Sequence, residues 1–384
     1  MLEKQKWKII RKEYSGGIRM KMKKTVALIA TMAMSASLLV GCADKGNDAA
    51  GAGSSEGKSA VSVGLVTDEG GINDKSFNQT ANVGVEKAVK ELGIEYKYVE
   101  SQKKEDYQPN IQSLIDNGSE LTFAIGYQLA DAVEAAAKDN PDSKFCLVDS
   151  VVEASNVESI TFKEEEGSFL MGVIAGLTTK TNKVGFIGGK DQDTIVKFEA
   201  GFAAGVAAVN PEAAKGLMSS DGTSAGSTVK YADSFSDTNK GYELAKSLYE
   251  ADCDIIYHAA GGVGIGMFQA TKELRDAGKE VWAIGVDMDQ AVSLPEFADV
   301  ILSSMMKRVD NATFDTAKAI TEGKFDAGHK VLGIAEGGVG MSESTSKNTA
   351  ADVIEKAKEF EEKIKNGEFE VPATREGAAN FKLN

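Results

Sequence analysis

Cysteine and histidine are scarce in this chain, with only three cysteines and two histidines among 384 residues. A disulfide framework needs several paired cysteines, and zinc or copper sites are usually built from clustered Cys and His side chains. Cys146 lies inside an apolar run and Cys253 borders another, so both are predicted to be small buried side chains. The sequence therefore predicts no structural disulfide, no metal site and no cofactor.

Arginine is also rare. After residue 60 the only arginines are Arg275, Arg308 and Arg375. Carboxylate and phosphate ligands are usually held by bidentate arginine, so this scarcity favours an uncharged ligand. Acidic side chains outnumber basic ones by 58 to 43, giving a net charge of -15. That balance argues against a nucleic-acid partner, because such binding depends on neutralising phosphates.

The long apolar run near the start of the chain is too short to cross a bilayer. Residues 26–40 follow three lysines at positions 21–24, and a membrane-spanning helix needs about 20 apolar residues. We interpret residues 1–41 as a signal peptide. Glu3 and Glu13 do not suit such a leader, so we hypothesise that translation starts at Met20 or Met22 and that residues 1–19 are a mis-assigned start.

The signal core ends in Leu-Val-Gly-Cys at residues 39–42, which resembles the lipobox of bacterial lipoproteins. Cys42 is therefore predicted to be the lipidated first residue of the mature protein. The alternative, a buried structural cysteine, fits poorly because residues 42–60 are small and polar and are predicted to form a flexible tether. The expected location is the extracytoplasmic face of the cell membrane, held there by the lipid alone.

Residues 61–92 have the pattern of a strand, a polar loop and a helix. Apolar residues at 61–66 form the strand, and a stripe with three- and four-residue spacing from Phe77 to Leu92 predicts the helix. Ser76 and Gln79 fit a capping box at its start. Strands and helices then alternate along most of the chain, which predicts an α/β fold with parallel sheets.

An internal repeat with an offset of 121 residues relates the two halves of the chain. It matches Val63, Gly64, Phe77, Gly84 and Val85 with Val184, Gly185, Phe198, Gly205 and Val206. Because the matches fall on the same strand–loop–helix unit, they predict two similar lobes facing a ligand cleft. We expect lobe 1 to comprise residues 61–162 and about 288–310, and lobe 2 to comprise residues 163–287 and about 311–384.

The loop after the first strand is the first candidate ligand site, because open α/β sheets collect ligands between a strand's carboxyl end and the next helix. Asp68 and Asn73 lie in this loop. Asp149 and Asp287 likewise follow apolar strands, and carboxylates at such positions can accept hydrogen bonds from sugar hydroxyls. The alternative is that these side chains only cap turns or helices.

Three other motifs are poor matches to catalytic or nucleotide sites. Residues 222–226 have the G-x-S-x-G pattern around Ser224, but lack the apolar strand that a nucleophile elbow requires. Met267 stands where the glycine run 261–266 would need a further glycine for dinucleotide binding, and residues 183–191 lack two required positions of a P-loop. No catalytic residue is assigned. An extracellular serine hydrolase, using Ser224 with His258 or His329, remains the alternative from another class.

Seven ordered motifs resemble the basic membrane protein (Bmp) family of substrate-binding lipoproteins. They are DEGGINDKSFNQ (68–79), KEEEGSFLMGVIAGL (163–177), KVGFIGG (183–189), KFEAGFAAGV (197–206), HAAGGVGIGMFQA (258–270), AIGVDMDQ (283–290) and SSMMKRVD (303–310). The resemblance implies a type I periplasmic-binding-protein fold, with two Rossmann-like lobes joined by three crossovers. It also implies a monomer that binds purine nucleosides (guanosine, inosine or adenosine) and passes them to the permease and ATPase subunits of an ABC importer. Another neutral ligand, such as a simple sugar, is the alternative within this class.

The resemblance also implies roles for individual residues. Phe77 and Phe235 would stack on the two faces of the purine, and Asp68 and Asn78 would reach its polar edges. Asp287 and Lys307 would hold the ribose, Gly261 and Gly262 would contribute backbone groups, and Asp149 is a weaker member of the set. The loop at residues 215–226 is longer and more polar than the family pattern, and it is expected at the rim of the site.

Overall fold

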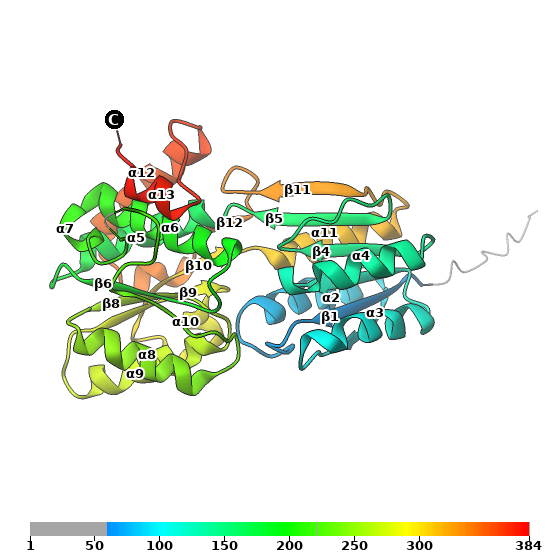
Figure 1. The fold of residues 1–384 in the computed structure, drawn as a ribbon, viewed down its shortest axis with the longest axis horizontal. Helices are drawn as coiled ribbons and strands as arrows, with labels where there is room; N and C mark the ends of the chain where they lie inside the picture. The colour runs from blue at the N-terminus through cyan, green and yellow to red at the C-terminus, as the bar shows by residue number, and fades with distance from the viewer. Residues whose placement is uncertain (1–59, 220, 384) are drawn as a thin grey trace, which may run out of the picture. The chain divides into compact units, whose positions relative to one another are not determined.

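The structure is a computed structural model that describes residues 60–219 and 221–383. The predicted signal peptide, Cys42 and the tether up to residue 59 lie outside the described residues. The described part forms two α/β lobes, each built on a six-stranded sheet (Figure 1). Within it, no helix has both the length and the apolar character needed to cross a membrane.

Lobe 1 is a parallel sheet with the strand order β11-β5-β4-β3-β1-β2. Its strands are β1 (Ser62–Thr67), β2 (Glu95–Val99), β3 (Leu121–Ile125), β4 (Lys144–Val148), β5 (Val157–Phe162) and β11 (Gly328–Leu332). Helices α2 (Phe77–Leu92) and α11 (Val309–Thr321) pack together, as do α3 (Tyr107–Asp116) and α4 (Ala130–Asp139). Two short 3₁₀ turns, η1 (Lys104–Asp106) and η2 (Tyr127–Leu129), precede α3 and α4.

Lobe 2 repeats this plan with the strand order β12-β10-β9-β8-β6-β7. Its strands are β6 (Val184–Gly188), β7 (Val229–Tyr231), β8 (Ile255–Ala259), β9 (Trp282–Asp287), β10 (Ile301–Lys307) and β12 (Val339–Met341), of which only β12 pairs antiparallel. Helix α5 (Glu164–Thr178) packs on α6 (Asp193–Val209), and α8 (Thr238–Glu250) packs on α9 (Val263–Asp276). The remaining turns and helices are α7 (Pro211–Ala214), α10 (Gln290–Ser293), η3 (Pro295–Phe297), η4 (Glu343–Lys347), α12 (Ala351–Lys365) and α13 (Arg375–Ala379).

The chain crosses between the lobes three times, and the last two crossings differ from the prediction. Residues 288–310 are predicted in lobe 1, but β10 pairs with β9 in lobe 2. Residues 311–384 are predicted in lobe 2, and β12, α12 and α13 do lie there, but α11 packs on α2 and β11 pairs with β5 in lobe 1. Strand β10 is buried like the central strands of both sheets, so its pattern does not indicate which sheet it joins.

The repeat predicted from the sequence corresponds to the strand–loop–helix unit β1–α2 and its equivalent β6–α6. Gly84 and Gly205 explain part of the match. A Cβ at Gly84 would lie 2.0 Å from the carbonyl oxygen of Asp310 in α11, and a Cβ at Gly205 would lie 2.0 Å from that of Phe169 in α5. Each lobe therefore needs glycine at the same helix crossing, because any side chain there would strike backbone.

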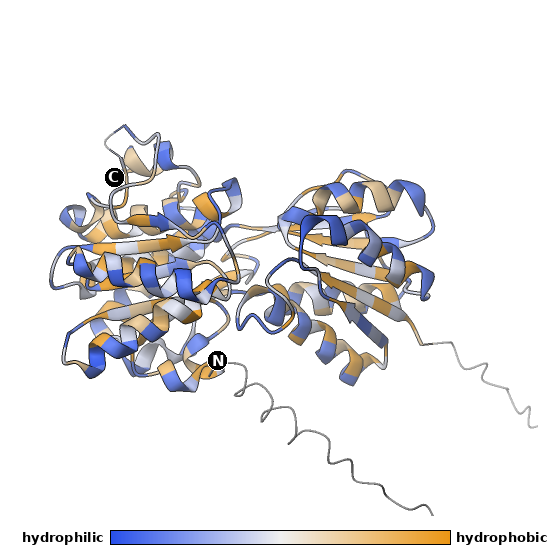
Figure 2. Ribbon diagram, turned by 60° about the horizontal axis from the view of Figure 1, so that its bottom comes forward, coloured by the Kyte–Doolittle hydropathy of each residue, from blue (hydrophilic) through white to orange (hydrophobic). Residues whose placement is uncertain are grey.

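Hydrophobic residues are concentrated in the strands of both sheets (Figure 2). Helix α12 buries Val353, Ala357, Phe360 and Ile364, which recur at three- and four-residue steps, and it packs on α5. Cys146 and Cys253 are buried, with 0% and 2% of their surface exposed, as expected for small apolar side chains.

Candidate ligand site between the two lobes

A pocket lies where the carboxyl ends of the strands in both lobes meet. The space between its walls, including the mouth open to solvent, is about 530 Å³. Eight of the ten predicted ligand residues line it: Asp68, Phe77, Asn78, Asp149, Phe235, Gly261, Asp287 and Lys307. Residues that are more than 200 positions apart in the sequence thus contribute to one cavity.

Two predicted residues lie outside the pocket wall. Asn73 is exposed on the loop before α2. The backbone N–H of Gly262 donates to the carbonyl oxygen of Phe235 at 2.9 Å, so it is used to hold the Phe235 loop. Neither Asn73 nor Gly262 is therefore assigned to the ligand site.

Asp74 lies in the predicted ligand loop, and it organises the start of α2. Its carboxylate accepts hydrogen bonds from the backbone N–H groups of Ser76 at 2.9 Å, Asn78 at 2.9 Å and Gln79 at 3.0 Å. The predicted capping box is wrong, because Ser76 makes no side-chain capping bond. Its hydroxyl instead donates to the carboxylate of Asp287 in the other lobe, which leaves the capping function to Asp74.

The side chains of Asp68 and Asn78 hold each other in place. Asp68 Oδ1 accepts from Asn78 Nδ2 at 2.7 Å and from the backbone N–H of Gly70 at 2.9 Å. Asn78 is 1% exposed, and its Oδ1 has no hydrogen-bond partner among the residues that the structure describes. Since a buried acceptor without a partner is costly, Asn78 Oδ1 is a ready contact for a ligand N–H group.

Asp149 and Asp287 occupy equivalent positions in the two lobes, because Asp149 follows β4 and Asp287 ends β9. Both adopt the left-handed backbone conformation, with φ of 70° and 67°, which residues other than glycine seldom adopt. Backbone strain of this kind is often kept where it directs a side chain into a functional site. Here it turns both carboxylates into the same pocket.

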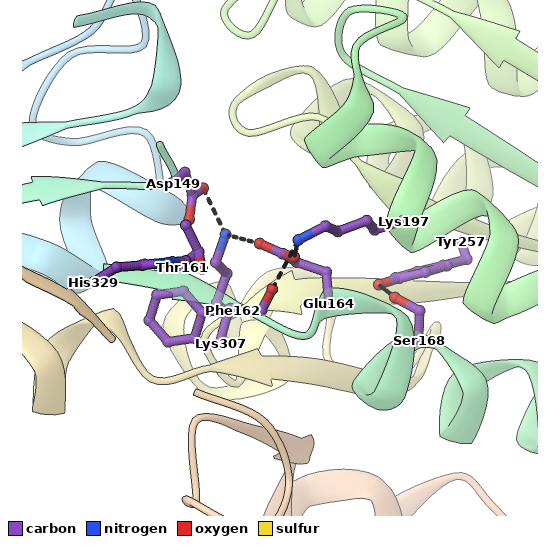
Figure 3. A network of polar contacts seen from close by, with 9 residues as sticks. All are labelled: Asp149, Thr161, Phe162, Glu164, Ser168, Lys197, Tyr257, Lys307 and His329. Atoms are coloured by element: carbon purple, nitrogen blue, oxygen red, sulfur yellow. Dashed lines mark hydrogen bonds and ion pairs between the residues drawn. The ribbon is translucent and has the colours of Figure 1, made fainter. Parts of the chain in front are cut away.

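Lys307 connects the pocket to the crossovers between the lobes (Figure 3). Its ammonium lies 2.6 Å from Asp149 Oδ2 and 2.9 Å from Glu164 Oε1. The other oxygen of Glu164 is 3.2 Å from Lys197 Nζ. Lys307 ends β10 and Glu164 begins α5, so their ion pair joins the first and second crossovers. Asp149 Oδ1 has no hydrogen-bond partner and is available to a ligand.

Burial dominates the electrostatics of the site. It raises the pKa of Asp74 to about 7 despite three backbone hydrogen bonds, and it raises the pKa of Asp149 to about 6 although Lys307 opposes it. Burial alone would lower the pKa of Lys307, but Asp149, Glu164 and Asp287 outweigh it and raise the pKa. Lys307 therefore stays charged.

The pocket has four aspartates, at positions 68, 74, 149 and 287, and one ammonium group in its wall. No arginine of the described chain is among its lining residues. Arg275 stacks on Trp282, while Arg308 and Arg375 pair with Asp310 and Glu199. This arrangement repels anions and supports the predicted preference for an uncharged ligand.

Aromatic rings line the pocket from both lobes. The pocket wall includes Phe77 of α2 in lobe 1, and Phe198 of α6 and Phe235 of the loop after β7 in lobe 2. Tyr127 of η2 packs edge-on against Phe235, with ring centroids 6.4 Å apart, and its hydroxyl has no hydrogen-bond partner. Gly189 makes room for Phe235, since a Cβ there would lie 2.1 Å from the ring.

Ser224 and the two histidines do not form a catalytic group. Ser224 is exposed, and the only hydrogen bonds found for it in the described chain are with Ser219. His258 is fully buried and bonds to Gln290, and His329 bonds to Thr161 in lobe 1. The surrounding 215–226 loop, which was expected at the rim, contributes no residue to the pocket wall.

Two α/β lobes with a buried polar and aromatic pocket between them define a solute-binding protein of the type I periplasmic-binding-protein fold. The crystal structure of an ABC transporter solute-binding protein from Aeropyrum pernix K1 aligns with 81% of this chain and 94% of that chain, with a TM-score of 0.71 and 27% sequence identity. The chain belongs to the Bmp family, described as PnrA-like substrate-binding proteins of ABC transporters, which it matches over residues 61–375. It is accordingly a binding protein and not an enzyme.

Curated relatives extend along almost the whole chain. A CD4+ T-cell-stimulating antigen of Listeria innocua is 39% identical over 365 residues, covering 91% of this chain and 99% of the relative. The ABC transporter nucleoside-binding protein BmpA of Lactococcus lactis is 37% identical and covers 92% and 100%. Basic membrane protein A of Borreliella burgdorferi is 34% identical and covers 85% and 91%.

Proposed function

We propose that this protein binds purine nucleosides between its two lobes and delivers them to the permease of an ABC importer. The observation that carries the proposal is the composition of the pocket wall. Phenyl rings from opposite lobes, Phe77 and Phe235, share one cavity with buried acceptor oxygens that have no partner in the described part of the chain. A flat, uncharged ring system carrying N–H and O–H donors satisfies both features.

The aromatic rings provide most of the expected affinity. Stacking of a base on an aromatic side chain contributes about 1–3 kcal/mol per ring. Phe77 comes from lobe 1 and Phe235 from lobe 2, so a base placed between them is fully enclosed only when the lobes are closed. The close backbone of Gly189, in the same lobe, restrains the Phe235 ring before the ligand arrives, and the edge contact with Tyr127 of lobe 1 is added when the lobes close.

The polar groups favour a purine nucleoside over a simple sugar. Asn78 Oδ1 offers an acceptor to an N–H group at the edge of a base, and Asp68 holds that amide in the required orientation. Asp149 Oδ1 offers an acceptor to a ribose hydroxyl beside Lys307. A ligand that lacks either donor leaves a buried oxygen unpaired, which is how such sites gain specificity.

The transport role follows from the family, and the name of the Lactococcus lactis relative includes nucleoside binding. Closure of the lobes around a nucleoside would present a new surface to the permease. We further propose that Cys42 carries a lipid anchor at the extracytoplasmic face and that the protein is a monomer. A related chain from Pyrococcus abyssi, 30% identical, is described as a lipoprotein.

A thermal-shift panel on the purified protein tests this proposal. Guanosine, inosine and adenosine should raise the melting temperature. Ribose should have little effect because it has no base to stack on the aromatic rings, and guanosine monophosphate should have little effect because the acidic pocket repels its phosphate. Stabilisation by ribose alone would indicate that the ligand is a sugar and not a nucleoside. Stabilisation by the monophosphate would contradict the argument from pocket charge.

A further inference from the structure

Gln290 makes a contact between the lobes that the ligand site does not explain. Its side-chain Nε2 donates to the backbone carbonyl oxygen of Lys75 at 2.9 Å. Gln290 belongs to α10 in lobe 2, whereas Lys75 lies in the loop of lobe 1 that leads into α2. Gln290 is 0% exposed and does not line the pocket.

The amide of Gln290 has only one possible orientation. Its Oε1 accepts from the backbone N–H of Val286 at 2.9 Å, and its Nε2 faces a carbonyl oxygen that can only accept. His258 Nε2 lies 2.9 Å from the same Oε1, so this nitrogen carries the proton. Burial lowers the pKa of His258 to about 4, which keeps the ring neutral and its hydrogen bond constant near neutral pH.

Two glycines in the family motifs make room for this arrangement. A Cβ at Gly285 would lie 2.5 Å from Gln290 Oε1, and a Cβ at Gly264 would lie 2.0 Å from the His258 ring. The backbone N–H of Gln290 also donates to Ser304 Oγ at 3.1 Å. Lobe 2 thus holds the amide in place from several sides, with its donor directed at lobe 1.

Other contacts between the lobes are either weaker or part of the ligand site. Lys190 and Glu69 form an ion pair at 3.3 Å, but their side chains are 26% and 31% exposed, and such pairs contribute little in water. Ser76 and Lys307 contact Asp287 and Asp149, both of which line the pocket. The contact from Gln290 to Lys75 is buried and independent of the ligand atoms.

We infer that Gln290 is a positioning residue that latches the closed lobes and sets how long a bound nucleoside stays, without touching it. Lys75 immediately precedes Ser76, Phe77 and Asn78, so holding its carbonyl holds the lobe 1 wall of the pocket. Lys75 itself has the left-handed φ of 58°, a conformation that an external contact must stabilise. This inference rests on the proposed function for the identity of the ligand.

The latch forms only when the lobes close, so its loss should affect dissociation and not association. In the open state both Gln290 and the Lys75 carbonyl can bond to water, whereas in the closed state an unpaired buried carbonyl is costly. Replacing the donor should therefore destabilise the closed state relative to the open state, whether or not a nucleoside is bound. A contact that forms only after the nucleoside has entered the protein changes the affinity mainly through the dissociation rate constant.

The test compares Gln290→Glu with the full-length wild type and with Gln108→Glu, which makes the same change of charge at an exposed glutamine on α3. The substituted carboxylate keeps an acceptor for Val286 and His258 but removes the donor to Lys75. We expect guanosine to dissociate from Gln290→Glu about tenfold faster or more and to associate within twofold of the wild-type rate, in a variant that circular dichroism shows to be folded. Gln108→Glu should match the wild type in all of these measurements.

Hydrogen exchange of the peptide covering residues 72–80 provides the second measurement, and it should be faster in Gln290→Glu. An unchanged dissociation rate would overturn the inference, and so would a general loss of stability with both rate constants altered. If the wild type binds no nucleoside, the proposed function fails. The latch is then judged by peptide exchange in the ligand-free proteins, where equal rates in variant and wild type would overturn it.

Discussion

Phe77 and Phe198 hold equivalent positions in the two lobes, 121 residues apart, and their rings face the same ammonium group. Lys307 Nζ lies 5.0 Å from the centroid of Phe77 and 5.5 Å from that of Phe198. The duplicated strand–loop–helix unit therefore supplies two walls around one buried cation. Phe235, which follows β7, has no counterpart in the repeat, and it gives the pocket a separate aromatic surface for a base.

Replacing Phe235 by alanine should weaken guanosine binding at least tenfold while the fold survives. The ring is half-buried in the ligand-free protein, so its main role is to stack on the base, at about 1–3 kcal/mol. Phe314→Ala is the matched control, because this half-buried ring packs on Lys87 outside the pocket. Calorimetry on both variants checks the prediction, and equal affinities would contradict stacking on Phe235.

Removing the charge of Lys307 should destabilise the folded protein by about 3–5 kcal/mol, because it leaves the buried carboxylate of Asp149 without its cation and that of Glu164 with Lys197 alone. Lys307→Met tests this in urea unfolding. Lys104→Met is the control, since the ion pair of Lys104 with Asp131 is exposed and should matter little. If the two variants have similar stability, the buried ion network does not hold the crossovers together.

The glycine at the α5–α6 crossing should be irreplaceable. Gly205→Ala would place a Cβ 2.0 Å from the Phe169 carbonyl oxygen, and forcing the helices apart should cost at least about 2 kcal/mol. Gly340→Ala is the control, because its added Cβ would meet no atom closer than 3.8 Å. Thermal unfolding of the two variants measures the difference, and a Gly205→Ala protein as stable as Gly340→Ala would refute the packing argument.

Asp74 should make the folded protein less stable as pH rises from about 4 to about 7. Burial raises its pKa to about 7, so in this window the folded state keeps a proton that the unfolded chain, with a pKa of about 3.9, releases. The free energy of unfolding then falls with rising pH. Asp74→Asn removes this contribution, and its melting temperature should fall less steeply over this range than that of the wild type.

The control for this pH series is Asp139→Asn, which changes an exposed aspartate on α4 and should keep the wild-type slope. A slope in Asp74→Asn that equals the wild-type slope would show that Asp74 does not bind a proton on folding.

The residues that sequence reasoning placed correctly in the pocket lie directly after apolar strands or within continuous motifs. Asp68, Asp149 and Asp287 follow strands whose carboxyl ends meet at the cleft, and the parallel-sheet pattern alone indicates that position. Tyr127 also follows a buried strand, after Gly126, and the same rule would have identified it. The 3₁₀ turn that carries Tyr127 is too short to show an apolar periodicity, so the sequence pattern does not predict it.

The contacts that were missed depend on tertiary partners. Ser76 has the sequence of a helix cap, but the carboxylate of Asp287 in the other lobe takes its hydroxyl and Asp74 caps α2 instead. Glu164 stands in the first turn of α5, where a carboxylate complements the helix dipole, but its ion pair with Lys307 depends on the fold. The sheet to which β10 belongs was also missed, because an apolar strand fits either lobe equally well.

Calorimetric titration of the wild-type protein with guanosine, beside Phe77→Ala and Phe235→Ala, tests the central claim most directly. The account predicts saturable binding of one guanosine per chain, weakened at least tenfold in each variant. Absence of binding, or binding that neither substitution changes, would contradict a nucleoside held between the rings of the two lobes.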